Sequence, residues 1–219
     1  MSSIVAASLP ARLGAELPLK FALLVTLLVV FCVFYFGLQH VAMFPLRRVP
    51  ETFVDRAILF DPGWVWTYQS IYLVMPVLPW LATDRDQLAR YAHGFALLSV
   101  GCFAVFLFVP VEGPRPAVIP DDWGYQFLVS YDSKLNAFPS MHMGLTVYTF
   151  LVGYELLHER LDWGGRWFFA LVAFSWITLI LYATLATKQH WAVDLPPGMI
   201  AAWGAYKWAW RPPLGGSTS

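Results

Sequence analysis

Long stretches without a charged side chain constrain this chain of 219 residues more than any other feature. Six apolar runs alternate with short polar segments, and each run has roughly the 20 residues that a helix needs to cross a bilayer core of about 30 Å. Only 13% of the residues are charged, whereas a soluble domain has about 25%. The sequence therefore predicts an all-α fold, a polytopic bundle of six transmembrane helices.

We expect the helices at residues 21–38, 62–82, 91–111, 136–157, 167–187 and 190–210. The first run is longer than a usual signal-peptide core, and no convincing cleavage site follows it, so we expect a retained helix. Pro76 and Pro79 should kink the second run. One integral-membrane domain is expected over residues 1–219, with a disordered tail at about residues 212–219.

Charge sets the expected orientation and partners. The net charge of zero gives no strong attraction to nucleic acid. Six helices place both termini on one side, where eight of the 14 Lys and Arg residues would lie. The positive-inside rule then predicts a multi-pass protein of the cell membrane with both termini in the cytoplasm. Arg47 and Arg48, on the outer side, either belong to an interfacial loop or help to hold an anionic lipid headgroup.

The head of the fourth run carries the first candidate site, in the sequence Asn-Ala-Phe-Pro-Ser-Met-His at residues 136–142. Serine is a good helix N-cap and proline suits a first turn, so a helix should begin near Ser140. The backbone N–H groups of such a helix start, including that of Met141, form an anion site. His142 at that end could donate a proton to a phosphate oxygen.

A second histidine, His190, lies at the head of the sixth run, and Asp194 follows four residues later. If this segment is helical, the carboxylate shares a face with the imidazole and can orient it. A carboxylate at the centre of a membrane helix costs about 2.5–3.5 kcal/mol on insertion scales, so Asp194 should have a partner or a function. Arg115 and Lys188 fall on the same membrane face as both histidines in a six-helix chain.

These residues together favour phosphoryl transfer at the outer face. His190 would attack phosphorus and form a phosphohistidine, while His142 would protonate the leaving oxygen. Asp194 would fix the tautomer of the nucleophile. Arg115, Lys188 and the helix start at Ser140 and Met141 would stabilise phosphate charge. Each short pattern alone is more often incidental than catalytic, and their joint placement carries the prediction.

At these residues the chain resembles the type-2 phosphatidic acid phosphatase superfamily, which is related to the vanadium haloperoxidases. The family motifs are Lys-x6-Arg-Pro, Pro-Ser-Gly-His and Ser-Arg-x5-His-x3-Asp. The matches are Arg115-Pro116, Pro139-Ser140-x-His142 and His190-x3-Asp194. The resemblance implies His190 as nucleophile, His142 as general acid and Asp194 as orienting carboxylate, with no metal and no other cofactor.

The chain also departs from the family pattern. Phe108 stands at the position of the first-motif lysine, Met141 replaces the glycine, and Ala183-Thr184 replace Ser-Arg. Lys188 could supply a replacement charge. The sequences Thr-Lys-Gln-His and Asn-Ala-Phe-Pro-Ser-x-His resemble the branch related to inositol phosphorylceramide synthases, in which the same residues transfer headgroups between lipids.

The expected function is that of a membrane phosphatase acting on lipid phosphates or diphosphates. The alternatives are a headgroup phosphotransferase on the same fold and, with less support, a non-catalytic transporter, flippase or scaffold. Phosphatidic acid, phosphatidylglycerol phosphate, a polyprenyl diphosphate and a sphingolipid precursor all fit as substrates. The expected partners are this lipid substrate and membrane lipids, with no nucleic acid, and a homo-oligomer is compatible with the sequence.

Overall fold

The fold was analysed in a computed structural model, which describes residues 9–41 and 43–211. The tail expected at about residues 212–219 lies outside the described residues. Within the described part the chain is helical without a β-strand, and two isolated β-bridges join Arg47 to Val111 and Val111 to Asn136. In chain order the helices are α1 (Leu9–Gly14), α2 (Leu17–Leu38), α3 (Phe53–Ala57), η1 (Pro62–Trp64), α4 (Val65–Gln69), α5 (Ile71–Val77), η2 (Leu78–Leu81), α6 (Arg85–Phe108), α7 (Trp123–Tyr131), α8 (Met141–Leu157), α9 (Trp163–Ala186), η3 (Ala192–Asp194) and α10 (Leu195–Ala209).

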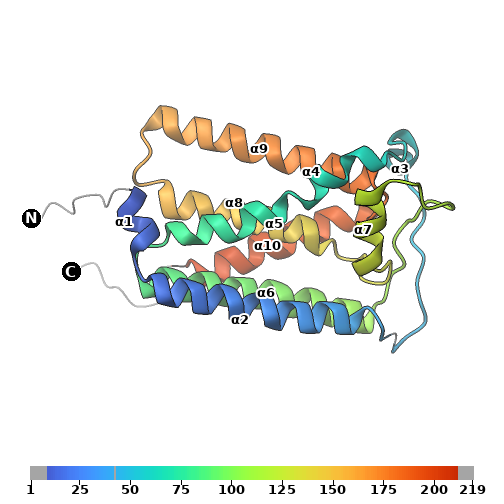
Figure 1. Ribbon diagram of the computed structural model, residues 1–219, viewed down its shortest axis with the longest axis horizontal. Helices are drawn as coiled ribbons and strands as arrows, with labels where there is room; N and C mark the ends of the chain where they lie inside the picture. The colour runs from blue at the N-terminus through green and yellow to red at the C-terminus, as the bar shows by residue number, and fades with distance from the viewer. Residues whose placement is uncertain (1–8, 42, 212–219) are drawn as a thin grey trace, which may run out of the picture.

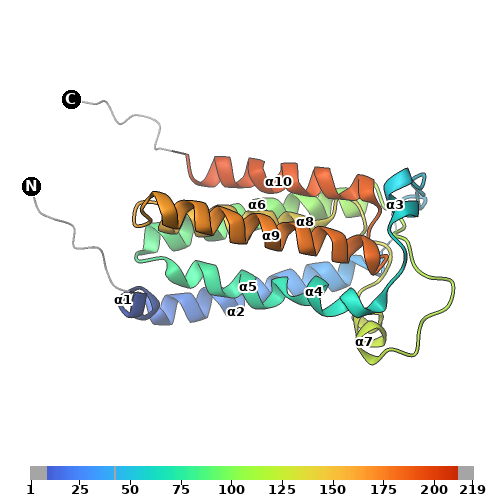
Figure 2. The same cartoon turned by 90° about the horizontal axis from the view of Figure 1, so that it is seen from above.

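The longer helices run along one axis of an elongated bundle (Figures 1 and 2). Helix α1 and the end of α10 lie at one end of the bundle, whereas α3, α7 and the start of α10 lie at the other. Helix α8 runs through the middle and is buried along most of its length, packed against α6, α9 and α10. Both ends of the described chain therefore lie at the same end of the bundle.

Among the residues that the structure describes, three helices are long and apolar enough to cross a membrane, namely α2, α6 and α9. The other three apolar runs form shorter or interrupted helices beside them. Pro76 lies inside α5 and Pro79 in the first turn of η2, and these prolines interrupt the second run. The fourth run becomes helical only at Met141, and the sixth begins with the short helix η3 before α10 starts at Leu195. The chain is thus a helical protein with three candidate membrane spans, and the six-span count stays a prediction.

Two buried cations join the first helices to the end of the bundle that carries α1. Arg12 donates from Nη1 to the carbonyl oxygens of Leu81 (2.7 Å) and Leu156 (2.9 Å), near the C-terminal ends of η2 and α8. Lys20 donates to the carbonyl oxygens of Arg12 and Trp80. Helix C-termini leave carbonyl groups without partners, so these two side chains stabilise helix ends.

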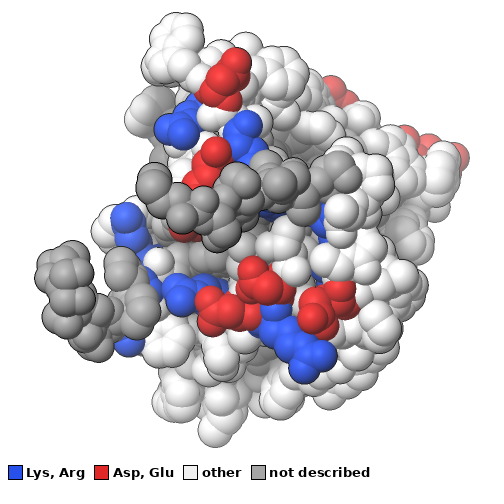
Figure 3. All heavy atoms as spheres, turned by 90° about the vertical axis from the view of Figure 1, so that its left-hand side faces the viewer, with Lys and Arg blue, Asp and Glu red and all other residues white. Residues whose placement is uncertain are grey.

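Positive and negative side chains are intermixed on that end of the molecule (Figure 3). Arg85 pairs with Glu16 at 3.1 Å, and Arg90 pairs with Asp86 at 2.7 Å. Exposed pairs of this kind contribute little to stability. They do, however, reduce the net positive field of this end, which agrees with the small excess of Lys and Arg counted from the sequence.

The long polar connection after α6 contains a short helix, α7, that the sequence patterns did not predict. Asp122 caps it by accepting a hydrogen bond from the backbone N–H of Tyr125 at 2.8 Å. Tyr125 and Leu128 are fully buried, whereas Trp123 is exposed. This amphipathic helix of nine residues lies at the end of the bundle opposite α1, on the side away from α10 (Figure 2), and its buried face packs against α4.

Candidate active site

Helix α8 begins where the sequence predicts, with Ser140 as its N-cap. The Ser140 hydroxyl oxygen accepts from the backbone N–H of Met143 at 3.3 Å, and its own N–H donates to the carbonyl oxygen of Asp194 at 2.9 Å. Pro139 lies just outside the helix rather than in its first turn. The start of α8 is thereby tied to the segment that carries the second histidine.

The close approach of α10 to α8 depends on Gly198. A Cβ atom at this position would lie 2.1 Å from the carbonyl oxygen of Ser140, far inside van der Waals contact. Only glycine leaves room for that carbonyl group. A glycine at this position therefore lets the two helix starts meet, and the candidate site lies at their junction.

His190 is held by a backbone carbonyl group. Its Nδ1 atom lies 2.7 Å from the carbonyl oxygen of Ala137. A carbonyl oxygen can only accept, so Nδ1 carries the hydrogen and Nε2 keeps a free lone pair. The sequence analysis expected Asp194 to orient this ring through helical spacing, but His190 precedes η3 and is not itself helical.

The carboxylate of Asp194 nevertheless lies beside the ring, with Oδ2 at 3.7 Å from Nδ1 of His190. Asp194 is fully buried, and Oδ2 accepts from the backbone N–H of Trp191 at 2.8 Å. The other oxygen, Oδ1, has no hydrogen-bond partner among the described residues. A buried carboxylate at this distance is placed to stabilise positive charge that a reaction would develop on the imidazole ring.

His142 is fixed by Tyr68 in two ways. Its Nε2 atom donates to the carbonyl oxygen of Tyr68 at 2.6 Å, and the two rings stack at a centroid distance of 3.8 Å and an angle of 8°. The Tyr72 ring meets His142 edge-on. Because Nε2 donates to the carbonyl group, Nδ1 is the nitrogen that can exchange a proton with a ligand.

A buried aspartate supports Tyr68 from behind. Asp132 accepts from the hydroxyl groups of Tyr35 (2.9 Å) and Tyr68 (3.3 Å). These contacts join α2, α4 and the end of α7 around His142. Sequence reasoning missed all three residues, because aromatic side chains in apolar runs give no pattern that separates a site from a core.

The two histidines line one pocket. Its other described lining residues come from α2, α5 and the segment before and within α8: Phe31, Tyr35, Tyr72, Asn136, Met141 and Leu145. Both imidazole rings are buried, His142 at 6% and His190 at 7% exposure. The structure therefore brings together the two histidines that the sequence analysis paired, at the end of the bundle opposite α1.

Arg115 lies beside this pocket rather than in it. Its guanidinium group donates to the carbonyl oxygens of Asp132 (3.0 Å) and Lys188 (3.2 Å) and to the side-chain oxygen of Gln189. These bonds join the connection after α6 to the segment before His190. Arg115 thus places a positive charge next to the segment that carries His190 while holding that segment in position.

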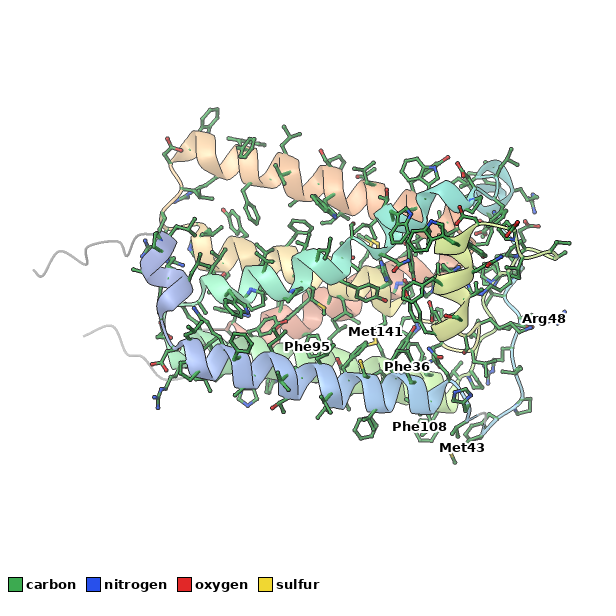
Figure 4. All side chains as sticks on the ribbon, in the orientation of Figure 1. Phe36, Met43, Arg48, Phe95, Phe108 and Met141 are labelled. Atoms are coloured by element: carbon green, nitrogen blue, oxygen red, sulfur yellow. The ribbon has the colours of Figure 1, made fainter. Side chains whose placement is uncertain are left out.

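Arg115 also lines an outer pocket with Arg48, Glu112, Lys134 and Trp191. The Glu112 carboxylate pairs with Lys134 and, at 2.8 Å, with Arg48. Hydrogen bonds from these two cations lower the pKa of Glu112. The Arg48 side chain is exposed and projects from the segment after α2 (Figure 4).

Lys188 does not point into the histidine pocket. It adopts a left-handed backbone conformation with φ of 51°, and its ammonium group donates to the carbonyl oxygens of Asp55 (2.8 Å) and Ile58 (2.7 Å). Lys188 therefore caps the end of α3, and Asp55 in turn accepts from the backbone N–H of Ala192 at 2.8 Å. The expected replacement for the family's missing cations is directed elsewhere in this structure.

The positions that depart from the family motifs also have clear surroundings. Phe108 is 55% exposed at the end of α6, and Thr184 is buried with its hydroxyl group donating to the Ile180 carbonyl oxygen. Met141 begins α8 and contributes to the pocket wall (Figure 4). Among these positions, only Met141 contacts the space between the histidines.

The sequence model of the PAP2 superfamily matches residues 91–213, more than half of the chain. The chain belongs to the PAP2 superfamily. Neither the curated proteins nor the solved structures gave a match. Membership in the PAP2 superfamily points to a phosphatase or phosphotransferase, and the match contains Arg115, both histidines and Asp194. Helices α2, α4 and α5, which provide Phe31, Tyr35, Tyr68 and Tyr72, lie before it.

Proposed function

We propose that the protein is an integral-membrane, metal-independent phosphatase that hydrolyses lipid phosphates or diphosphates through a phosphohistidine at His190. One observation carries the proposal. Nδ1 of His190 donates to a backbone carbonyl group, which leaves Nε2 as a nucleophile in the pocket that also contains His142. A nucleophile held in one tautomer next to a proton donor is the arrangement that this reaction requires.

The reaction proceeds in two steps. Nε2 of His190 forms a bond to phosphorus as the bond to the leaving oxygen breaks, and the Nδ1–H of protonated His142 gives its proton to that oxygen. Water then attacks phosphorus, neutral His142 takes one proton from it, and the N–P bond breaks. Inorganic phosphate and the starting state of both histidines result.

Charge stabilisation comes from groups around the pocket. Asp194 steadies the positive phosphoimidazolium ring from 3.7 Å. The N-terminus of α8, with the backbone N–H groups of Met141 and His142, faces the phosphate oxygens. Arg115 adds positive potential from the neighbouring segment. Ser140 acts through its cap, which orients the helix start.

A phosphotransferase that moves a lipid headgroup, similar to inositol phosphorylceramide synthases, is the second candidate. The burial of both histidines favours it, because a site with little access to water lets an acceptor alcohol reach the phosphohistidine first. We place the site at the outer face of the cell membrane and both termini in the cytoplasm, in agreement with the positive-inside count.

The test is phosphate release by purified protein from a panel of lipid phosphates and diphosphates in detergent with EDTA. We expect release from wild type and from the control His158→Ala, whose imidazole bonds to the Glu155 carbonyl at the end of α8. His190→Ala and His142→Ala should lose turnover while remaining folded. Full activity in either variant would overturn the proposal. Transfer to an added alcohol without phosphate release would instead identify the phosphotransferase.

A further inference from the structure

An apolar groove inside the bundle lies next to the pocket between the histidines. This groove, here called the tail groove, lies between α2, α5, η2 and α6, and its walls include Leu24, Leu27, Phe31, Met75, Pro79 and Phe95. Phe31 lines both the tail groove and the histidine pocket. One side chain therefore separates the reacting phosphate from an apolar channel.

We infer that the tail groove binds the hydrocarbon chain of the substrate while its phosphate lies between the histidines. The inference rests on the proposed function and names the part of the substrate that the chain selects. A single substrate molecule can fill both the histidine pocket and the tail groove only by passing Phe31. Its hydrocarbon chain and its phosphate must then be covalently joined. The substrate class is therefore a phosphate ester of a long-chain alcohol or an acylated glycerol, rather than a small soluble ester.

The direction of the groove fits this occupant. From Phe31 the groove follows α2 back to Lys20, eleven residues, or about 16 Å of helix. That direction leads from the site end of the bundle towards the end that carries α1 (Figure 1). A lipid with its phosphate at the histidines would extend its chain the same way, into the core of a bilayer.

The far end of the groove is lined by a polar group. Lys20 lines it there, with its ammonium group bonded to the carbonyl oxygens of Arg12 and Trp80. Methylene groups gain free energy only against apolar walls. The groove thus has a defined length, and binding should improve with chain length until the chain reaches Lys20.

The wall at the junction is aromatic. The Phe31 ring stacks on Tyr35 at 5.3 Å and meets Phe95 at 5.9 Å. Tyr35 in turn donates to Asp132 behind the histidine pocket. Phe31 therefore belongs both to the apolar side of the junction, with Phe95, and through Tyr35 to the polar side.

The first test measures kcat/KM for hexyl, dodecyl and hexadecyl phosphate. Leu24→Trp places an indole in the groove, whereas the control Val33→Trp adds one on the same helix at a position that is 65% exposed. Val33 is not among the described residues lining the tail groove or the histidine pocket.

The wild-type preference for hexadecyl over hexyl phosphate should fall about tenfold in Leu24→Trp, since about two methylene groups lose their contacts. Val33→Trp should keep the preference. Equal preferences in the two variants would overturn the inference.

The second test does not depend on turnover. Hexadecyl phosphate with a diazirine at the end of its chain is cross-linked to His190→Ala protein, and the labelled peptides are identified. Label at residues 20–28 or 75–80 that unlabelled hexadecyl phosphate displaces would support the inference. Label that spreads over the outer surface of the helices and is not displaced would refute it. If the groove is labelled specifically but wild-type protein forms no phosphohistidine, the groove inference stands and the proposed chemistry is wrong.

Discussion

Replacing Asp194 with asparagine removes a charge while keeping the shape of the side chain. Oδ2 of Asp194 lies 3.7 Å from Nδ1 of His190. In the proposed mechanism, a positive phosphoimidazolium ring would form there. Two unit charges at this distance attract by about 4 kcal/mol at an effective dielectric constant of about 20. If that attraction is made mainly in the transition state, its loss lowers kcat roughly a thousandfold.

The assay separates attack from hydrolysis. Rapid-quench measurement of phosphohistidine in a single turnover should show slow phosphoenzyme formation in Asp194→Asn, with a normal unfolding temperature. The asparagine side-chain oxygen can still accept from the Trp191 N–H, so the local fold should persist. Asp162→Asn, which changes the same charge at the exposed cap of α9, serves as the control. A kcat for Asp194→Asn within about threefold of wild type would refute the electrostatic role.

Substitutions of three further residues, Gly198, Tyr68 and Arg115, test the geometry of the site. Gly198→Ala should destabilise the fold by about 3 kcal/mol or prevent folding, because its Cβ would overlap the Ser140 carbonyl oxygen. The control Gly204→Ala lies on the same helix with open space around it, so this variant should unfold no more easily than wild type. Thermal unfolding in detergent compares the two variants. Tyr68→Phe keeps the ring stacked on His142, so it should retain most activity and lose about 1 kcal/mol of stability with the hydroxyl hydrogen bond. Tyr68→Leu removes the stacked ring and should lose most of its kcat. Equal kcat values in the two variants would contradict a role for the ring in holding His142. Arg115→Lys should reduce kcat strongly, because one ammonium group cannot donate to the oxygens of Asp132, Lys188 and Gln189 at the same time. Unchanged kinetics would exclude a positioning role for Arg115.

The helical class and the placement of the site at one end of the bundle follow from patterns that are local in sequence. Uncharged runs predict apolar helices, and a serine before such a run predicts a cap, as found at Ser140. The interruptions were harder to locate, because a proline signals a break without fixing its extent. Helix α7 lies among prolines and charges and is stabilised by burial of Tyr125 and Leu128, which no local pattern shows.

The contacts that hold the histidines could not be predicted in the same way. Both rings donate to backbone carbonyl groups, of Tyr68 and Ala137, which lie 74 and 53 positions away in sequence. Any residue type presents a carbonyl group, so the sequence has no signal for these partners. Lys188 illustrates the converse, because its charge and position suggested a phosphate ligand, whereas its left-handed backbone directs the ammonium group to α3.

The difference between contacts that need a particular side chain and contacts that any residue can make also explains why the match to the PAP2 superfamily begins only at residue 91. The proposed chemistry needs the particular side chains of His142, His190 and Asp194, and all three lie within the match. The earlier helices contribute the Tyr68 carbonyl oxygen, which any residue could supply, and the apolar walls around Phe31, which many residues could form. Selection on the chemistry would therefore constrain residues after 91 directly and the earlier helices mainly through the shape of the tail groove. Substitutions at His142, His190 or Asp194 should lower turnover of every substrate, whereas substitutions of the α2 residues that line the tail groove should change which chain length is preferred.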